Sequence, residues 1–175
     1  MSLSTTIAPP EPGEYHEYYE TYISKADSNN FFQAFEEQPQ ELRQVLGELE
    51  PGEDSRLHEP YTWTLKQVMG HLIDCERVFS NRLLRIAVGD TTPIPGIEQN
   101  MYVASIDYES TNMNDLLEEF EHLRAANVLM VKRFSSGSLS RMGTASDNPV
   151  SAKANLYILA GHVVYHLDIV KRRLA

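Results

Sequence analysis

The sequence has 175 residues, 42% of them hydrophobic, which is enough for one domain with a single sizeable core. Its formal net charge of −10 at pH 7 argues against a surface that binds nucleic acid or anionic membranes. The single cysteine, Cys75, excludes an intrachain disulfide, and no apolar run approaches the roughly 20 residues that span a bilayer. We therefore expect a cytoplasmic protein with no nucleic-acid and no membrane partner.

The N-terminal part of the chain predicts a tail followed by a short helix. Residues 1–14 are rich in Pro, Ser and Thr and predict a mobile tail, so the domain itself covers residues 15–175. Tyrosines then recur three and four residues apart, which is the spacing of one helix face. They are Tyr15, Tyr18, Tyr19 and Tyr22.

The segment 29–49 predicts a helix in two pieces. Its apolar residues recur at helical spacing, and Pro51-Gly52 ends the pattern. Pro39 lies inside the segment. Because proline lacks an N–H and fits best in the first turn of a helix, we expect an interruption there. A loop then runs to Trp63.

The segment 64–88 predicts a long amphipathic helix with clear ends. Thr64 is followed three residues later by Gln67, which is the pattern of a capping box. Gly89-Asp90 ends the apolar repeat. The connection that follows, residues 91–102, contains two prolines, and connections of this length within a compact domain are often functional.

Two further helices complete the prediction. One runs from Asn112 or Asn114 to Phe134, with Thr111 or Asn114 as its N-cap candidates. A polar connection follows, and the last helix covers about 150–174 and is apolar on most sides, so it should lie deep in the core. No segment alternates as a strand would. The sequence predicts an all-α protein, a four-helix bundle.

The last helix carries the most informative pair of residues, His162 and His166. They are one turn apart on one helix face, so both imidazoles can reach one cation. His71 stands at a core-facing position of the 64–88 helix. Burying an imidazole without a partner costs about 1–3 kcal/mol, so these histidines favour a shared divalent ion with an open coordination position. The alternative is a set of core histidines satisfied without metal.

Five other residues are candidates near that site. Asp74 could orient a ligand or hold a metal-bound water, or it could form a salt bridge. Cys75 could be a fourth ligand, although a small buried apolar side chain is the simpler interpretation. Glu98, Gln99 and Asn100 could approach the open side of the metal from the 91–102 connection, or lie on a surface loop. We take Asp74, Glu98 and Asn100 as the candidate catalytic residues.

Three segments, residues 61–77, 89–102 and 161–169, resemble the DinB-like superfamily, which includes the YfiT-type metal-dependent hydrolases. The likeness runs from about residue 30 to the end. It implies an up-down-down-up bundle, here with an extra short N-terminal helix, and homodimers. It also implies one divalent metal on His71, His162 and His166, with nickel or zinc foremost and iron or manganese also open.

The resemblance also implies an activity. Members of the family include transferases for bacterial low-molecular-weight thiols and a mycothiol-dependent isomerase. Our leading hypothesis is a hydrolase or thiol S-transferase whose metal lowers the pKa of a bound water or thiol and acts on a small-molecule substrate. The alternative is a metal-binding, stress-related bundle protein without catalysis. A site that opens to a pocket favours the enzyme, and a closed site favours the alternative.

Overall fold

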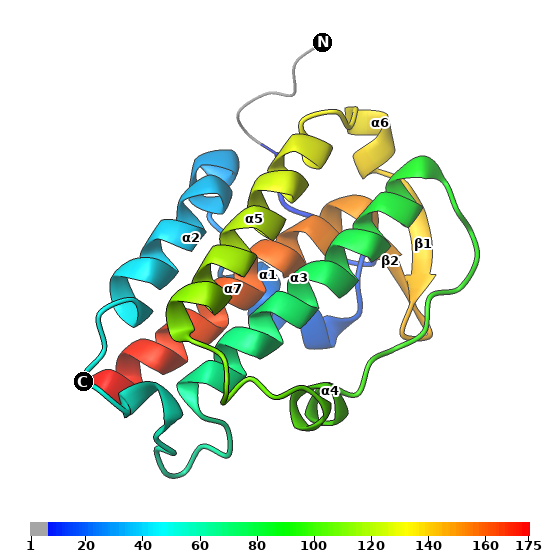
Figure 1. Cartoon of the computed structure of the whole chain (residues 1–175). Helices are drawn as coiled ribbons and strands as arrows, with labels where there is room; N and C mark the ends of the chain where they lie inside the picture. The colour runs from blue at the N-terminus through cyan, green and yellow to red at the C-terminus, as the bar shows by residue number, and fades with distance from the viewer. Residues whose placement is uncertain (1–6) are drawn as a thin grey trace.

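The computed structural model describes residues 7–175, and a bundle of long helices dominates it (Figure 1). The long helices are α2 (Phe31–Leu46), α3 (Leu65–Val88), α5 (Met113–Val131) and α7 (Ala152–Leu174). Both α2 and α3 pack against α5 and α7. The predicted four-helix bundle is confirmed.

Short elements surround the bundle. They are η1 (Glu17–Tyr19), α1 (Glu20–Ile23), η2 (Glu53–Ser55), α4 (Gln99–Ser105), α6 (Ser136–Leu139), β1 (Met142–Ala145) and β2 (Asn148–Ser151). Of these, α1 packs against α7, and α4 packs against α3 (Figure 1). The two contacts bring segments far apart in the sequence against α3 and α7.

Side-chain caps mark the starts of α3, α5 and α7. Thr64 and Gln67 form the predicted capping box at the start of α3, and Gly89 ends that helix with a φ of 90°. The N-cap of α5 is Asn112, whose side chain accepts from the Asn114 N–H. The cap predicted at Thr111 or Asn114 was therefore one or two residues off, because several neighbouring residues in this segment can cap a helix.

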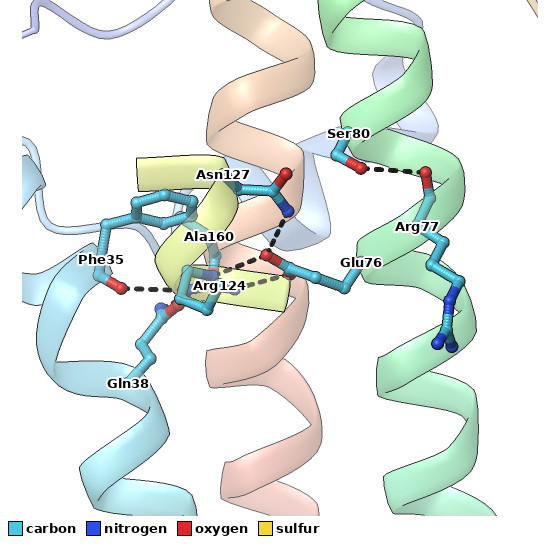
Figure 2. Close-up of polar contacts among 8 residues, drawn as sticks. All are labelled: Phe35, Gln38, Glu76, Arg77, Ser80, Arg124, Asn127 and Ala160. Carbon is cyan, nitrogen blue, oxygen red and sulfur yellow. Dashed lines mark hydrogen bonds and ion pairs between the residues drawn. The ribbon is translucent and has the colours of Figure 1, made fainter. Parts of the chain in front are cut away.

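Helix α2 is continuous through Pro39, so the predicted interruption is wrong. Proline removes the hydrogen bond that the Phe35 carbonyl would accept within the helix, since Phe35 stands four residues earlier. In this structure the Arg124 guanidinium on α5 donates to that carbonyl instead, with Nη1 3.0 Å from the oxygen (Figure 2). A tertiary contact thus replaces the bond that proline removes.

The chain also contains a β-hairpin, contrary to the expectation of no strand. β1 and β2 pair antiparallel through a two-residue turn at Ser146 and Asp147, whose φ angles are 52° and 62°. Positive φ at both positions is typical of a tight hairpin turn, but the sequence lacks the Asn-Gly or Asp-Gly signal that would predict one. Ile94 bridges to Ala145, so the hairpin anchors the 91–102 connection, whose end already belongs to α4.

The predicted N-terminal tail is described only in part. Residues 1–6 lie outside the described residues. Within the rest, Ile7 is buried and its carbonyl accepts from the Tyr157 hydroxyl at 2.6 Å. The Glu14 carboxylate accepts from the Ser151 hydroxyl and lies 3.2 Å from Lys153 Nζ. Residues 7–14 therefore pack along the start of α7.

The core consists of two apolar clusters along the bundle axis. One gathers the second half of α3 and the first half of α7 with Phe31 and Phe35, and the other gathers the opposite halves with Leu42 and Leu46. His71 and His162 lie where the two clusters meet. Among residues 7–175, no helix combines the length and the apolar character needed to cross a membrane.

Candidate metal centre

Helices α3 and α7 bring His71, His162 and His166 together. Each histidine offers one ring nitrogen, and these atoms lie within 4.8 Å of one another. The Nε2 atoms of His71 and His162 are 3.1 Å apart, and both side chains are buried. The core of the bundle therefore holds a compact group of imidazole nitrogens.

The geometry of the group fits a divalent ion. Metal–imidazole bonds are roughly 2.0–2.1 Å long, so two nitrogens on one ion lie roughly 3–3.5 Å apart. The 3.1 Å between the His71 and His162 Nε2 atoms falls in that range. An all-imidazole donor set suits zinc, copper, iron and nickel. The residues present therefore fit the metal that the sequence predicts.

Burial also keeps the histidines in the form that binds metal. It lowers the pKa of His71 from its ordinary 6.5 to about 4. It lowers the pKa of His166 to about 3, with a further contribution from the nearby His71. Burial lowers the pKa of His162 well below 6.5 as well. All three rings are neutral at pH 7, so a metal does not have to displace protons from them.

A cavity of about 290 Å³ opens beside the group and is lined by His71 and His162. Aromatic side chains from η1, α1 and α3 form part of its wall, and Glu98 and Gln99 at the start of α4 form another part. Pockets for small ligands typically start at roughly this volume. The histidine group is thus accessible to a small molecule.

Tyr22 reaches the site because α1 approaches α7 very closely. A Cβ on Gly161 would lie 1.9 Å from the Tyr22 carbonyl oxygen, so only glycine allows this approach. As a result the Tyr22 ring stands edge-on to the His162 ring, with 5.2 Å between centroids. Glycine at the position before a histidine therefore shapes the cavity wall.

Cys75 lies beside the histidines and lines the cavity. Its Sγ is 3.7 Å from both ring nitrogens of His71. Burial raises the pKa of the thiol to about 12, so without a metal it stays protonated. The sulfur is outside the set of ligand atoms that meet within 4.8 Å, and a role as fourth ligand stays a prediction.

Asp74 points to another part of the protein. It is buried and accepts a hydrogen bond of 2.7 Å from the Tyr108 hydroxyl, and it is not among the residues that line the cavity. Burial raises its pKa. The structure therefore does not bring Asp74 to the open side of the histidine group.

Asn100 lies on α4 and Glu98 is the N-cap residue of that helix; of the two, only Glu98 lines the cavity. The Glu98 carboxylate accepts from the Asn100 and Met101 backbone N–H groups and so caps α4. The Asn100 side chain donates to the same carboxylate at 3.1 Å. The structure thus places Glu98 at the cavity and Asn100 outside its lining, and the catalytic roles of both residues stay predictions.

Sequence reasoning missed two polar residues of the cavity, Arg82 and Ser146. Arg82 follows His71 by eleven residues and so shares its face of α3, a signal that the spacing contained. Ser146 comes from the hairpin turn, which the sequence did not predict, and no local signal connects it to α3.

The chain is similar to one protein family and to several solved structures. A family model described as the DinB superfamily matches residues 34–170. No curated protein matches the sequence significantly. Among solved structures, a probable metal-dependent hydrolase with an unusual four-helix bundle topology, YfiT from Bacillus subtilis, matches 94% of this chain and 92% of its own, with a TM-score of 0.75 and 16% identity.

A second similar structure is the mycothiol-dependent maleylpyruvate isomerase, together with a histidine-to-alanine variant of it. The match covers 78% of this chain and 57% of the isomerase chain, with a TM-score of 0.64 and 16% identity. At these identities the likeness establishes a shared fold.

Proposed function

Because the chain belongs to the DinB superfamily, we propose that it is a metal-dependent enzyme that acts on a small molecule at its histidine group. His71, His162 and His166 hold one divalent ion, with nickel or zinc foremost. The observation that carries the proposal is the 290 Å³ cavity, which His71 and His162 line directly. A purely structural metal site is saturated by protein ligands and has no need of such an opening.

The proposed reaction is hydrolysis or transfer of a low-molecular-weight thiol. A divalent ion on three imidazoles lowers the pKa of a bound water or thiol toward neutrality. The hydrolase assignment of YfiT supports the first reaction, and the mycothiol dependence of the isomerase supports the second. The cavity beside the histidines favours either reaction over a non-catalytic role, because both reactions need room for a second reactant.

The three predicted catalytic residues are given different roles according to their distance from the cavity. Glu98 is proposed to act on the substrate, because it is the one acidic residue among the described residues that line the cavity. Asn100 is proposed as a positioning residue that holds this carboxylate. Asp74 is proposed to act from further away, by fixing Tyr108 in the segment that follows α4.

Three wider expectations belong to the same proposal. The up-down-down-up order of the helices is supported by their directions in Figure 1, where α3 and α5 run opposite to α2 and α7. Homodimerisation rests on the family resemblance, whereas a cytoplasmic location rests on the composition of the chain, whose single cysteine suits a reducing compartment. Light scattering on the purified protein would test the dimer.

The first test is elemental analysis of protein purified without a nickel-affinity step. We expect about one divalent ion per chain in the wild type, and less than about a tenth of that in His162→Ala, because removal of one of three ligands leaves a weak site. The matched control is His122→Ala, an exposed histidine on α5 that should leave the metal content unchanged.

Two results would contradict the proposal. One is a wild type free of divalent metal that also takes up none on addition of zinc or nickel. The other is an unchanged metal content in His162→Ala. Metal-loaded protein would then be screened for hydrolysis of small electrophiles and for thiol transfer, with His162→Ala as the blank.

A further inference from the structure

The bundle buries two arginines, Arg82 and Arg124, which differ in their ion pairs and hydrogen-bond partners. Arg124 forms a two-bond ion pair with Glu76, with Nε and Nη2 each 2.8 Å from a carboxylate oxygen. Its remaining Nη1 donates to Gln38 and to the Phe35 carbonyl (Figure 2). Arg124 thus has both a counter-charge and a full set of acceptors.

Arg82 has neither. It is 3% exposed, and within residues 7–175 no carboxylate lies within 4.0 Å of its guanidinium. Its Nη2 donates to the Pro95 carbonyl and the Ser146 hydroxyl, both at 3.0 Å. Its Nε is the only buried side-chain nitrogen or oxygen of the described residues without a hydrogen-bond partner.

Burying the Arg82 guanidinium in this way costs free energy of folding. An arginine keeps its charge in proteins, and a buried charge without a counter-ion costs several kcal/mol. Two neutral acceptors and the Phe79 ring, whose centroid is 5.5 Å from the guanidinium carbon, do not neutralise it. A side chain kept in this state is expected to have its partner in a ligand.

Arg82 lines the same cavity as His71 and His162. A small molecule in that cavity can therefore meet the histidine group and the guanidinium together. The only carboxylate that lines the cavity, that of Glu98, is engaged in capping α4 and is exposed. The cavity thus offers one metal-binding end and one cationic end.

We propose that Arg82 binds a carboxylate of the substrate, so that this protein acts on a small carboxylic acid whose reactive group lies at the histidine end. A guanidinium donates strong, charge-assisted hydrogen bonds to a carboxylate, and within residues 7–175 the Nη1 of Arg82 donates to no protein acceptor, because both hydrogen bonds of this side chain come from Nη2. The proposal rests on the proposed function for the reaction, but the binding of the carboxylate does not depend on the metal.

The test uses ligand binding measured by calorimetry on the zinc-loaded protein. The probes are mercaptoacetate, 3-mercaptopropionate and 4-mercaptobutyrate, each paired with its uncharged amide. In the wild type we expect at least one acid to bind about tenfold or more tightly than its amide, which is the size of a charge-assisted hydrogen bond. Arg82→Gln should reduce that preference to less than about twofold.

Arg77→Gln is the matched control. Arg77 lies on the same helix, is exposed, and pairs with Glu119 outside the cavity, so its removal makes the same change in net charge without altering the cavity lining. It should leave the preference for the acid intact. The melting temperature of Arg82→Gln should be unchanged or raised, since the variant removes a buried charge without an ionic partner.

A second arm separates this inference from the proposed function. Butyrate and butyramide are titrated into metal-free protein, where only the Arg82 end can discriminate between them. Preference for butyrate that Arg82→Gln abolishes supports the inference even if no metal or thiol binds. Equal binding of acids and amides by the wild type in both arms, or a preference that survives in Arg82→Gln, overturns it while leaving the metal site standing.

Discussion

Glu76 joins three of the four long helices through one carboxylate. It is 1% exposed, and Oε1 accepts from both the Arg124 Nε and the Asn127 side-chain amide at 2.8 Å (Figure 2). Arg124 in turn reaches the Phe35 carbonyl on α2. The carboxylate of α3 thereby fixes the arginine that completes the hydrogen bonding of α2 around Pro39.

Substitution of Glu76 should therefore be severe. Glu76→Gln keeps the shape of the side chain but leaves the Arg124 charge uncompensated in the core. We expect the free energy of unfolding to fall by about 3–5 kcal/mol, which is the usual cost of breaking a buried pair from one side. Denaturant unfolding followed by circular dichroism measures this change.

Glu119→Gln provides the comparison. Glu119 pairs with Arg77 on the surface, where both side chains are about half exposed, and such pairs contribute about 0–1 kcal/mol. If the two variants lose equal stability, the buried network has no special role in the bundle.

At the scale of elements, the contact between α1 and α7 depends on Gly161. Alanine at this position would place its Cβ 1.9 Å from the Tyr22 carbonyl oxygen, which the backbone of α1 cannot accommodate without moving. Helix α1 and Tyr22 would have to shift away from α7. The cavity wall and the edge-on packing on His162 would change with them.

Gly161→Ala should lower the free energy of unfolding by about 1–3 kcal/mol, the usual cost of overpacking. The loss should appear even though alanine favours a helix over glycine by about 1 kcal/mol. Thermal unfolding measures it. Gly137→Ala is the control, because its new Cβ would meet only the Ser135 hydroxyl at 3.7 Å, and its stability should stay within about 0.5 kcal/mol or rise.

At the scale of the whole molecule, the neutral histidines link stability to pH. Burial lowers the folded-state pKa of His71 to about 4, below the 6.5 expected when it is exposed by unfolding. The unfolded state therefore binds protons first as the pH falls. This contribution to stability is complete above about pH 6.5 and is lost as the pH falls toward 4.

The prediction applies to protein freed of metal by a chelator. Between pH 7 and pH 4 the wild type should lose on the order of 3 kcal/mol through His71. His71→Leu should show a shallower dependence over the same range, and His122→Leu, at an exposed position outside the histidine group, is the matched control variant. Identical pH profiles for His71→Leu and the wild type would show that burial of this imidazole does not control its protonation.

Local patterns in the sequence were sufficient for much of the fold. Helix periodicity, the Thr64 capping box and the Gly89 terminator depend on residues within one or two turns, so the position of α3 could be predicted closely. The same periodicity put His162 and His166 on one face of α7 and His71 on the inner face of α3. The candidate ligands of the metal were therefore visible from spacing alone.

Only the tertiary structure decided the features that depend on groups from different helices and loops. A guanidinium on α5 replaces the hydrogen bond that Pro39 removes from α2, and no pattern around Pro39 contains that information. Likewise, the cavity that joins Arg82 to the histidine group forms only when α1, α4 and the hairpin turn close around α3 and α7. The sequence by itself determined which residues face inward, because that follows from the helical repeat. Packing decided which of these residues meet, because charges and close approaches between helices act through space.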